Sequence, residues 1–313
     1  MSFAACRSGE SVSVQTQLVR LLRACGSRLS PLLQFFAIVL VTMSAVRAEL
    51  VNIPAPHLGD GKTLRVQWFT PDAKTATGAA AILLHGCGGL GANGNLNARH
   101  KAAKDWLIER GIAVAMPESF TSRGFDEVCT IKMQSRTITQ SDRVKDVIAT
   151  RSWLDAQPGV DAKKVVLWGW SHGGGTTLAT ITHRVGDVFP DDVKFAQAIA
   201  FYPGCSSYLP SARVPKISSP LLLLIGEADD WTPAAPCVAW VEQLRQYQQD
   251  ATITVYPGAF HDFDNPAGKF RIRADVPNGV KKGKGVTVAP DPKAREDAMA
   301  KIDALLRKRG LVP

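Results

Sequence analysis

The sequence lacks the common signatures of a metal or redox protein. None of its six cysteines forms a Cys-x-x-Cys pair, which argues against a zinc ribbon and against a thioredoxin-type site. No His-Glu-x-x-His pair is present either. A metal site would have to be built from His85, His172 and His261, and the arrangement considered below gives His261 another role. We therefore expect neither a metal nor another cofactor.

Aromatic residues are almost missing from the most basic part of the chain. The 313 residues carry a net charge of +9. Between Lys269 and Arg309, twelve Lys and Arg stand against five Asp and Glu, yet the segment holds no nucleic-acid-binding motif. Binding to an anionic surface is one interpretation of such a segment. A solvated basic face is the better one, and we expect no nucleic-acid partner.

The N-terminal apolar run, residues 32–41, is too short to span a bilayer. Arg20, Arg23 and Arg28 precede it, and small residues follow it up to Ala48. This order is typical of a signal peptide, so we assign residues 1–48 to one and expect export to the periplasm or the medium. A retained membrane anchor is the alternative, but no stable anchor is expected after cleavage. Because the charged part is unusually long, translation could also start downstream of Met1.

Removal of this segment would leave four cysteines, which are Cys87, Cys129, Cys205 and Cys237. An even number in an oxidising compartment predicts two disulfides, with three possible connectivities, and buried free thiols are the alternative. Cys205 and Cys237 lie close to the ends of two strands expected to be neighbours. We therefore pair these two, which leaves Cys87 for Cys129.

Residues 49–313 alternate between apolar strands and helices. Strands that are apolar throughout, separated by helices, predict a mostly parallel sheet covered on both faces, in one α/β domain. A composition of 45% hydrophobic and 21% charged residues suits a soluble globular protein. The expected strands are 63–69, 78–85, 112–116, 165–170, 195–202, 220–225 and 252–256, and the expected helices are 98–110, 140–156, 172 onward, 233–248 and 292–309.

The strand that ends at Trp170 leads into the pentapeptide Gly169-Trp-Ser171-His-Gly173. A strand, a tight Gly-x-Ser-x-Gly turn and a helix together form the setting in which a serine becomes a nucleophile. Glycines are needed on both sides because a Cβ would clash in so tight a turn. Ser171 is therefore the predicted nucleophile.

A serine hydroxyl needs a histidine to accept its proton and an acid to orient that histidine. Asp229 follows the strand 220–225, and His261 follows the strand 252–256. The chain order Ser, Asp, His is that of α/β-hydrolases. Asp230 is the alternative acid, and Asp229 could instead cap the helix that begins near Pro233. Asp262 and Asp264 are expected to bind solvent or backbone.

Two backbone amides should stabilise the developing oxyanion. One is the amide of His172, directly after the nucleophile. The other should come from the glycine-rich loop after the strand 78–85, where the amide of Cys87 is the best candidate. This loop does not end in Gly-Lys-Ser/Thr, so a phosphate-binding P-loop is not expected there.

Arg123 lies in the loop after the strand 112–116, on the side of the sheet where Ser171 is expected. A guanidinium there could bind a substrate carboxylate through two hydrogen bonds. The alternative is a structural role, in which Arg123 ties its loop to a backbone carbonyl or to Glu127.

Over most of residues 60–310 the sequence resembles the dienelactone hydrolase family of α/β-hydrolases. The resemblance rests on His85–Gly89, Pro117–Phe120 with Arg123-Gly124, Gly169–Gly174, Tyr202–Cys205, Gly226–Pro233 and Gly258–Phe263. It implies a hydrolase without a cap domain that acts on small esters or lactones without a metal. The namesake enzymes use a cysteine nucleophile and a glutamate where this chain has Ser171 and Gly86. Their thiol activation and their substrate are therefore not transferred.

Together these features predict an exported, metal-independent serine hydrolase of carboxylic esters or lactones. Ser171, His261 and Asp229 would form its catalytic triad, and its partner would be a small-molecule substrate. A serine peptidase or amidase on the same fold is one alternative. A catalytically silent binding protein is the other.

Overall fold

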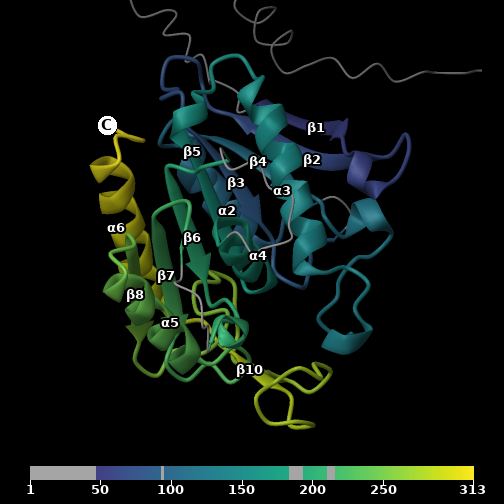
Figure 1. Ribbon diagram of the computed structural model, residues 1–313, viewed down its shortest axis with the longest axis vertical. Helices are drawn as coiled ribbons and strands as arrows, with labels where there is room; N and C mark the ends of the chain where they lie inside the picture. The colour runs from purple at the N-terminus through teal and green to yellow at the C-terminus, as the bar shows by residue number, and fades with distance from the viewer. Residues whose placement is uncertain (1–46, 93–94, 183–192, 210–215) are drawn as a thin grey trace, which may run out of the picture. The chain divides into compact units, whose positions relative to one another are not determined.

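An eight-stranded sheet forms the centre of the structure, a computed structural model that describes residues 47–92, 95–182, 193–209 and 216–313 (Figure 1). The strand order is β1-β2-β4-β3-β5-β6-β7-β8. β2 runs antiparallel to β1 and β4, and all other neighbours are parallel. The strands are β1 (Arg47–Pro54), β2 (Thr63–Thr70), β3 (Ala80–Leu84), β4 (Ala113–Pro117), β5 (Val165–Trp170), β6 (Gln197–Phe201), β7 (Leu221–Gly226) and β8 (Ala251–Tyr256).

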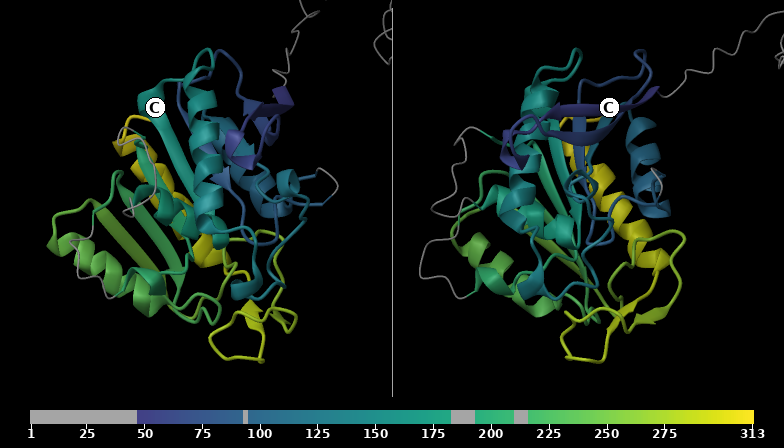
Figure 2. Two further views of the ribbon diagram at one scale, coloured as in Figure 1. Left: turned by 45° about the vertical axis from the view of Figure 1, so that its right-hand side comes forward. Right: turned by 90° about the vertical axis from the view of Figure 1, so that its right-hand side faces the viewer.

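Helices cover both faces of this sheet, as the apolar strands predict. Figure 2 shows α2 and α6 on one face and α3, α4 and α5 on the other. β3, β5, β6 and β7 are buried along their whole length, because helices pack against both of their sides. The helices are α2 (Ala98–Ile108), α3 (Gln140–Asp155), α4 (His172–Ile181), α5 (Ala234–Gln246) and α6 (Pro292–Lys308). The predicted mostly parallel α/β fold is confirmed.

Local sequence sets where these helices begin. Thr139 and Asp142 form a capping box at the start of α3, in which each side chain bonds the other residue's backbone amide. Asp291 caps α6 by accepting from the amides of Lys293 and Ala294. These caps satisfy amides that lack a partner inside the helix.

Three strands were not predicted. β1 is an antiparallel edge strand, and the predicted cleavage after Ala48 falls two residues inside it. β9 (Arg271–Arg273) and β10 (Val286–Val288) form a separate two-stranded sheet within the basic segment. Of the predicted signal peptide, residues 1–46 lie outside the described residues, and its cleavage stays a prediction.

Two disulfides join segments on the side where the parallel strands end. Cys87 bonds Cys129, with the Cα atoms 4.9 Å apart, and Cys205 bonds Cys237 at 5.0 Å. These are the two pairs expected from the sequence. The first links the loop after β3 to the segment before α3, and the second links the loop after β6 to α5. Among the described residues, no helix has the length and apolar character needed to cross a bilayer.

Candidate active site

Ser171 lies in a strained turn between β5 and α4. Its backbone φ angle is +51°, in a region that residues other than glycine rarely adopt. A Cβ on Gly169 would lie 2.2 Å from the carbonyl oxygen of Gly173, and one on Gly173 would lie 2.1 Å from that of Leu84. Both glycines are therefore required, because α4 approaches β5 and the end of β3 too closely for any side chain.

Ser171, His261 and Asp229 form one hydrogen-bonded row, although they follow three different strands. Ser171 Oγ lies 3.0 Å from His261 Nε2, and His261 Nδ1 lies 2.7 Å from Asp229 Oδ2. The side chains of His261 and Asp229 are almost fully buried. Buried hydrogen bonds of this kind fix the orientation of the imidazole relative to the hydroxyl.

The carboxylate of Asp229 is held by its own loop. One of its oxygens accepts from the amides of Trp231 and Thr232, at 2.9 and 2.8 Å. The other lies within hydrogen-bond distance of the Thr232 hydroxyl and of His261. Asp229 therefore does not cap α5, whose N-cap is Pro233. Asp230 turns away from His261, and the geometry favours Asp229 over it as the acid.

A buried polar network lies behind His261. The ring of Tyr202 lies 4.4 Å from the imidazole, and its hydroxyl donates to Asp264 at 2.5 Å. Trp170 Nε1 donates to the same carboxylate, and Arg99 pairs with Asp262. The expectation that Asp262 and Asp264 bind solvent or backbone is therefore wrong. It failed because Arg99 and Tyr202 are distant in sequence.

The pKa values of the two carboxyl groups in this network, Asp262 and Asp264, are shifted in opposite directions. Burial raises the pKa of Asp264 above its ordinary value. Burial acts on Asp262 in the same direction and is the largest single effect. The charge and hydrogen bond of Arg99, the hydrogen bond from Asn265 and the nearby His261 together outweigh it, so the pKa of Asp262 lies below the ordinary value. His261 thus packs against Tyr202, whose hydroxyl connects Asp264 with Arg99 of the Arg99–Asp262 ion pair.

The two candidate oxyanion donors lie beside Ser171. Cys87 and His172 both line the pocket that contains Ser171. The Gly86 carbonyl, which shares a peptide group with the Cys87 amide, accepts from His85 Nδ1 at 2.8 Å and from the Gly89 amide at 3.3 Å. The backbone of the loop after β3 is thereby held in place beside Ser171.

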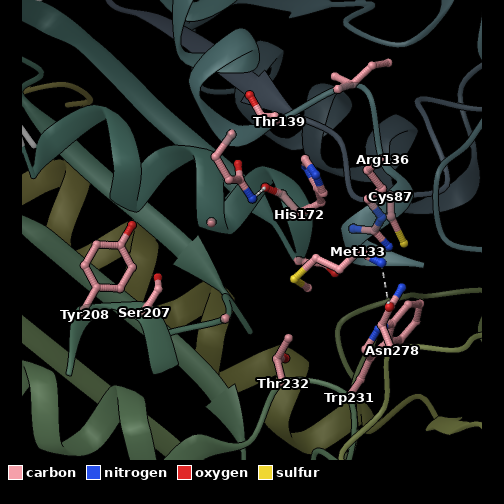
Figure 3. A pocket seen from close by; sticks show the side chains of 15 residues that line it. Cys87, Met133, Arg136, Thr139, His172, Ser207, Tyr208, Trp231, Thr232 and Asn278 are labelled. Carbon is pink, nitrogen blue, oxygen red and sulfur yellow. Dashed lines mark hydrogen bonds between the residues drawn. The ribbon is translucent and has the colours of Figure 1, made fainter. Parts of the chain in front are cut away.

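The pocket at Ser171 has a volume of about 340 Å³ (Figure 3). Sequence reasoning missed several of its residues, because they lie in irregular segments without a motif. Arg136 is one of them, and its Nε donates to the Ile131 carbonyl at 3.2 Å. The lining residues outside the motifs named from the sequence include Met133, Arg136, Ile138, Thr139, Gln140, Ser207, Tyr208 and Asn278.

Arg123 does not line this pocket. Its two terminal nitrogens bind the buried carboxylate of Asp146 at 2.8 and 2.9 Å, and one also donates to the Ser119 carbonyl. The substrate-binding interpretation of Arg123 is therefore corrected to a structural one. The carbonyl contact matches the alternative stated above, but the acidic partner is Asp146 instead of Glu127.

The histidines considered for a metal site make other contacts. His85 Nδ1 bonds the Gly86 carbonyl, and His172 Nδ1 bonds Arg143. Within the part of the chain that the structure describes, no three His, Cys, Asp or Glu side chains form a group suited to a metal ion.

Comparison with solved structures shows that this chain has an α/β-hydrolase fold. A structure described as a putative dienelactone hydrolase from Klebsiella pneumoniae matches with a TM-score of 0.62 at 18% identity, covering 84% of this chain and 99% of the other. Esterase 2 of Thermogutta terrifontis matches with a TM-score of 0.59 at 17% identity, covering 85% and 96%. At these identities the matches show the fold alone.

The model of the dienelactone hydrolase family matches residues 65–309, and the chain belongs to this family. A putative carboxymethylenebutenolidase of Saccharolobus solfataricus is 28% identical over 144 residues, 46% of this chain and 50% of its own length. Acylamino-acid-releasing enzyme 2 of rice, Oryza sativa subsp. japonica, is 23% identical over 273 residues, 74% of this chain and 34% of its own. The chain thus spans a third to a half of these curated relatives.

Proposed function

We propose that this protein hydrolyses carboxylic esters or lactones of small substrates through an acyl-enzyme on Ser171. The main support is the row Ser171–His261–Asp229, which opens into a pocket at its serine end. Membership of the dienelactone hydrolase family and a relative described as a carboxymethylenebutenolidase support the same class of reaction.

In the first half of this reaction, Ser171 Oγ attacks the substrate carbonyl carbon while His261 Nε2 accepts the hydroxyl proton. The carbonyl oxygen becomes an oxyanion that the amides of Cys87 and His172 bind. His261 then returns the proton to the leaving alkoxide, which departs as an alcohol. Asp229 accepts from His261 Nδ1 throughout and stabilises the transient imidazolium.

Water releases the acyl group in the second half. His261 Nε2 accepts a proton from the attacking water, a second oxyanion forms in the same amides, and Ser171 leaves with that proton. The product is a carboxylic acid. For a lactone, the alcohol and the acid belong to the same molecule.

The dimensions of the pocket favour small substrates. A volume of about 340 Å³ lies near the lower end of the range of roughly 300–1,000 Å³ that is usual for small-molecule sites. Its lining mixes apolar side chains such as Met133, Ile138 and Trp231 with the polar groups of the site.

Amide hydrolysis is the second candidate, because the rice relatives are described as acylamino-acid-releasing enzymes. Purified protein should be given a nitrophenyl butyrate ester and the matching anilide. The proposal expects ester turnover that exceeds anilide turnover by at least about 100-fold in kcat/KM, a difference of about 2.7 kcal/mol in the barrier. Equal rates would favour the amidase, and no turnover of any ester in a broad panel would favour a silent binding protein.

We further propose that the protein is exported after cleavage behind Ala48. Support comes from the N-terminal charge and hydropathy pattern and from the two disulfides, which persist in oxidising compartments. N-terminal sequencing of protein from the periplasm or medium should begin at Glu49. A product that keeps the apolar run would contradict this proposal.

A further inference from the structure

Arg143 is buried behind the candidate oxyanion hole and has no role in the mechanism above. It lies in the first turn of α3 and has no exposed surface. Its Nη1 lies 2.8 Å from His172 Nδ1, and its Nη2 donates to the His85 carbonyl at 2.9 Å. One side chain therefore contacts both segments from which the oxyanion amides come.

Among the described residues, no carboxylate forms an ion pair with Arg143. Asp146, whose negative charge acts on Arg143, is bound by Arg123 and His57. Arg143 Nε has no hydrogen-bond partner in the described part of the chain. Burial lowers the pKa of Arg143 to about 9. Burying a cation without a direct counter-charge costs free energy, so the hydrogen bonds of Arg143 to His172 and to the His85 carbonyl are needed to offset this cost.

The contact with His172 determines the state of that ring. A guanidinium only donates hydrogen bonds, so His172 Nδ1 must accept and the ring proton lies on Nε2. Burial and the charge of Arg143 both lower the pKa of His172, which keeps the ring neutral. The side chain of the residue after the nucleophile is therefore anchored to α3 in a defined tautomer.

The contact with His85 orients the other amide. His85 Nδ1 must donate to the Gly86 carbonyl, because a carbonyl oxygen only accepts. In a trans peptide the N–H points opposite to the C=O, so the Cys87 N–H points away from the His85 ring. Arg143 holds the backbone of His85 from α3, one residue before this peptide.

Phe120 fills the space between these groups. Its ring centroid lies 4.6 Å from that of His85 and 5.7 Å from that of His172, and the guanidinium of Arg143 lies 5.0 Å from it. Phe120 is buried as well. The cation, the two imidazoles and the phenyl ring thus form one packed cluster beside the segments that carry the two amides.

We propose that Arg143 is a positioning residue that fixes the spacing of the Cys87 and His172 amides by binding His85 and His172 at once. This inference rests on the proposed function. The two oxyanion donors belong to separate segments, the loop after β3 and the start of α4, and Arg143 bonds to both of these segments. Its positive charge also lies on the side where negative charge would develop, which adds to the stabilisation of the transition state.

The test compares Arg143→Met, Arg143→Lys and Arg151→Met with the wild type. Arg151 lies two turns further along α3, is also buried, and donates to the Ala162 carbonyl and to Asp155 far from the pocket. It is therefore the matched control for loss of a buried arginine from this helix. kcat and KM for nitrophenyl butyrate are measured for each folded variant, together with inhibition by an alkylboronic acid, whose serine adduct is tetrahedral and negatively charged.

Arg143→Met should lower kcat by about 100-fold, the order that loss of one oxyanion donor costs, while KM changes less than about threefold. Arg143→Lys should lower kcat by about 10-fold, because an ammonium group lacks the planar fork with which a guanidinium reaches both acceptors. Boronate affinity should fall in parallel with kcat, and Arg151→Met should keep kcat within about threefold of the wild type despite a lowered Tm.

The inference is overturned if Arg143→Met keeps kcat within about threefold, or if both arginine-to-methionine variants lose the same factor. If Arg143→Met does not fold, Arg143→Lys decides by the same criteria. Failure of the proposed function would look different, since the wild type itself would then neither hydrolyse esters nor bind the boronate.

Discussion

Thr287 donates to the carboxylate of Asp230 with both its amide and its hydroxyl, at 2.7 and 2.8 Å. These bonds tie the loop after β7 to strand β10 and turn Asp230 away from His261. The amide of Val280 also donates to the Asp230 carbonyl. Two adjacent aspartates therefore make different contacts, one to the candidate base and one to the β9–β10 segment.

Asp229→Asn should reduce kcat by roughly 10³- to 10⁴-fold, because an amide at this position favours the wrong tautomer of His261. Asp230→Asn should keep kcat within about tenfold and lower the free energy of unfolding by about 1–2 kcal/mol through weakened bonds to Thr287. Steady-state kinetics and urea unfolding of both variants check this. The opposite ranking of activities would make Asp230 the acid.

Gly173→Ala should destabilise the fold by about 3 kcal/mol or more, because the new methyl group would lie 2.1 Å from the Leu84 carbonyl oxygen. Gly204→Ala is the control, since its new methyl group meets nothing closer than 3.9 Å. Thermal unfolding followed by circular dichroism measures both. A Gly173→Ala variant as stable as the control would show that the turn can relax.

The two disulfides should differ in their effect on activity. Each double serine variant should lose about 4 kcal/mol of stability, since the loops closed span 42 and 32 residues. The kcat/KM of Cys87→Ser/Cys129→Ser should be well below that of Cys205→Ser/Cys237→Ser, because Cys87 supplies a candidate oxyanion amide. Kinetics below the unfolding transition test this, and equal activities would count against the role of Cys87.

Stability should fall as the pH falls below about 6.5. Burial lowers the pKa values of His85, His100 and His172, that of His100 to about 3. In the unfolded chain these histidines titrate near 6.5, so below that pH the unfolded state binds more protons than the folded state. Each histidine then lowers the free energy of unfolding by up to about 1.4 kcal/mol for each pH unit below 6.5. Its full contribution to stability is present above pH 6.5.

Urea unfolding at pH 7.5, 6.5 and 5.5 measures this dependence. His100→Gln should reduce the slope of the unfolding free energy against pH, below pH 6.5, by about one proton, because glutamine does not titrate. Glutamine can still donate to the Leu90 carbonyl that His100 Nδ1 contacts, so the variant keeps this hydrogen bond. An unfolding free energy that stays constant between pH 7.5 and 5.5 would refute the assignment of three neutral histidines.

The sheet and the row of candidate catalytic residues could be predicted because local patterns specify them. Wholly apolar strands indicate a parallel sheet, and parallel strands bring the residues after their carboxyl ends together at one edge. Ser171, Asp229 and His261 all follow such strands. β9 and β10 escaped prediction because three-residue strands in a basic segment leave no periodic signal.

Contacts of long side chains could not be predicted in the same way. Arg123 was placed near the pocket by its loop, yet its guanidinium turns to Asp146 in α3. Arg143 belongs to no motif, and its contacts with His85 and His172 are visible only in the folded structure. Such contacts depend on the packing of segments that are far apart in sequence.

Covalent labelling tests the central claim most directly. Wild-type protein is incubated with a fluorophosphonate, and its intact mass and its peptides are measured, with Ser171→Ala and Asp230→Asn treated alongside. The account predicts one adduct per chain, located on Ser171 and formed by Asp230→Asn as well, and no adduct on Ser171→Ala. An unlabelled wild type that nevertheless hydrolyses esters, or an adduct on any other residue, would contradict it.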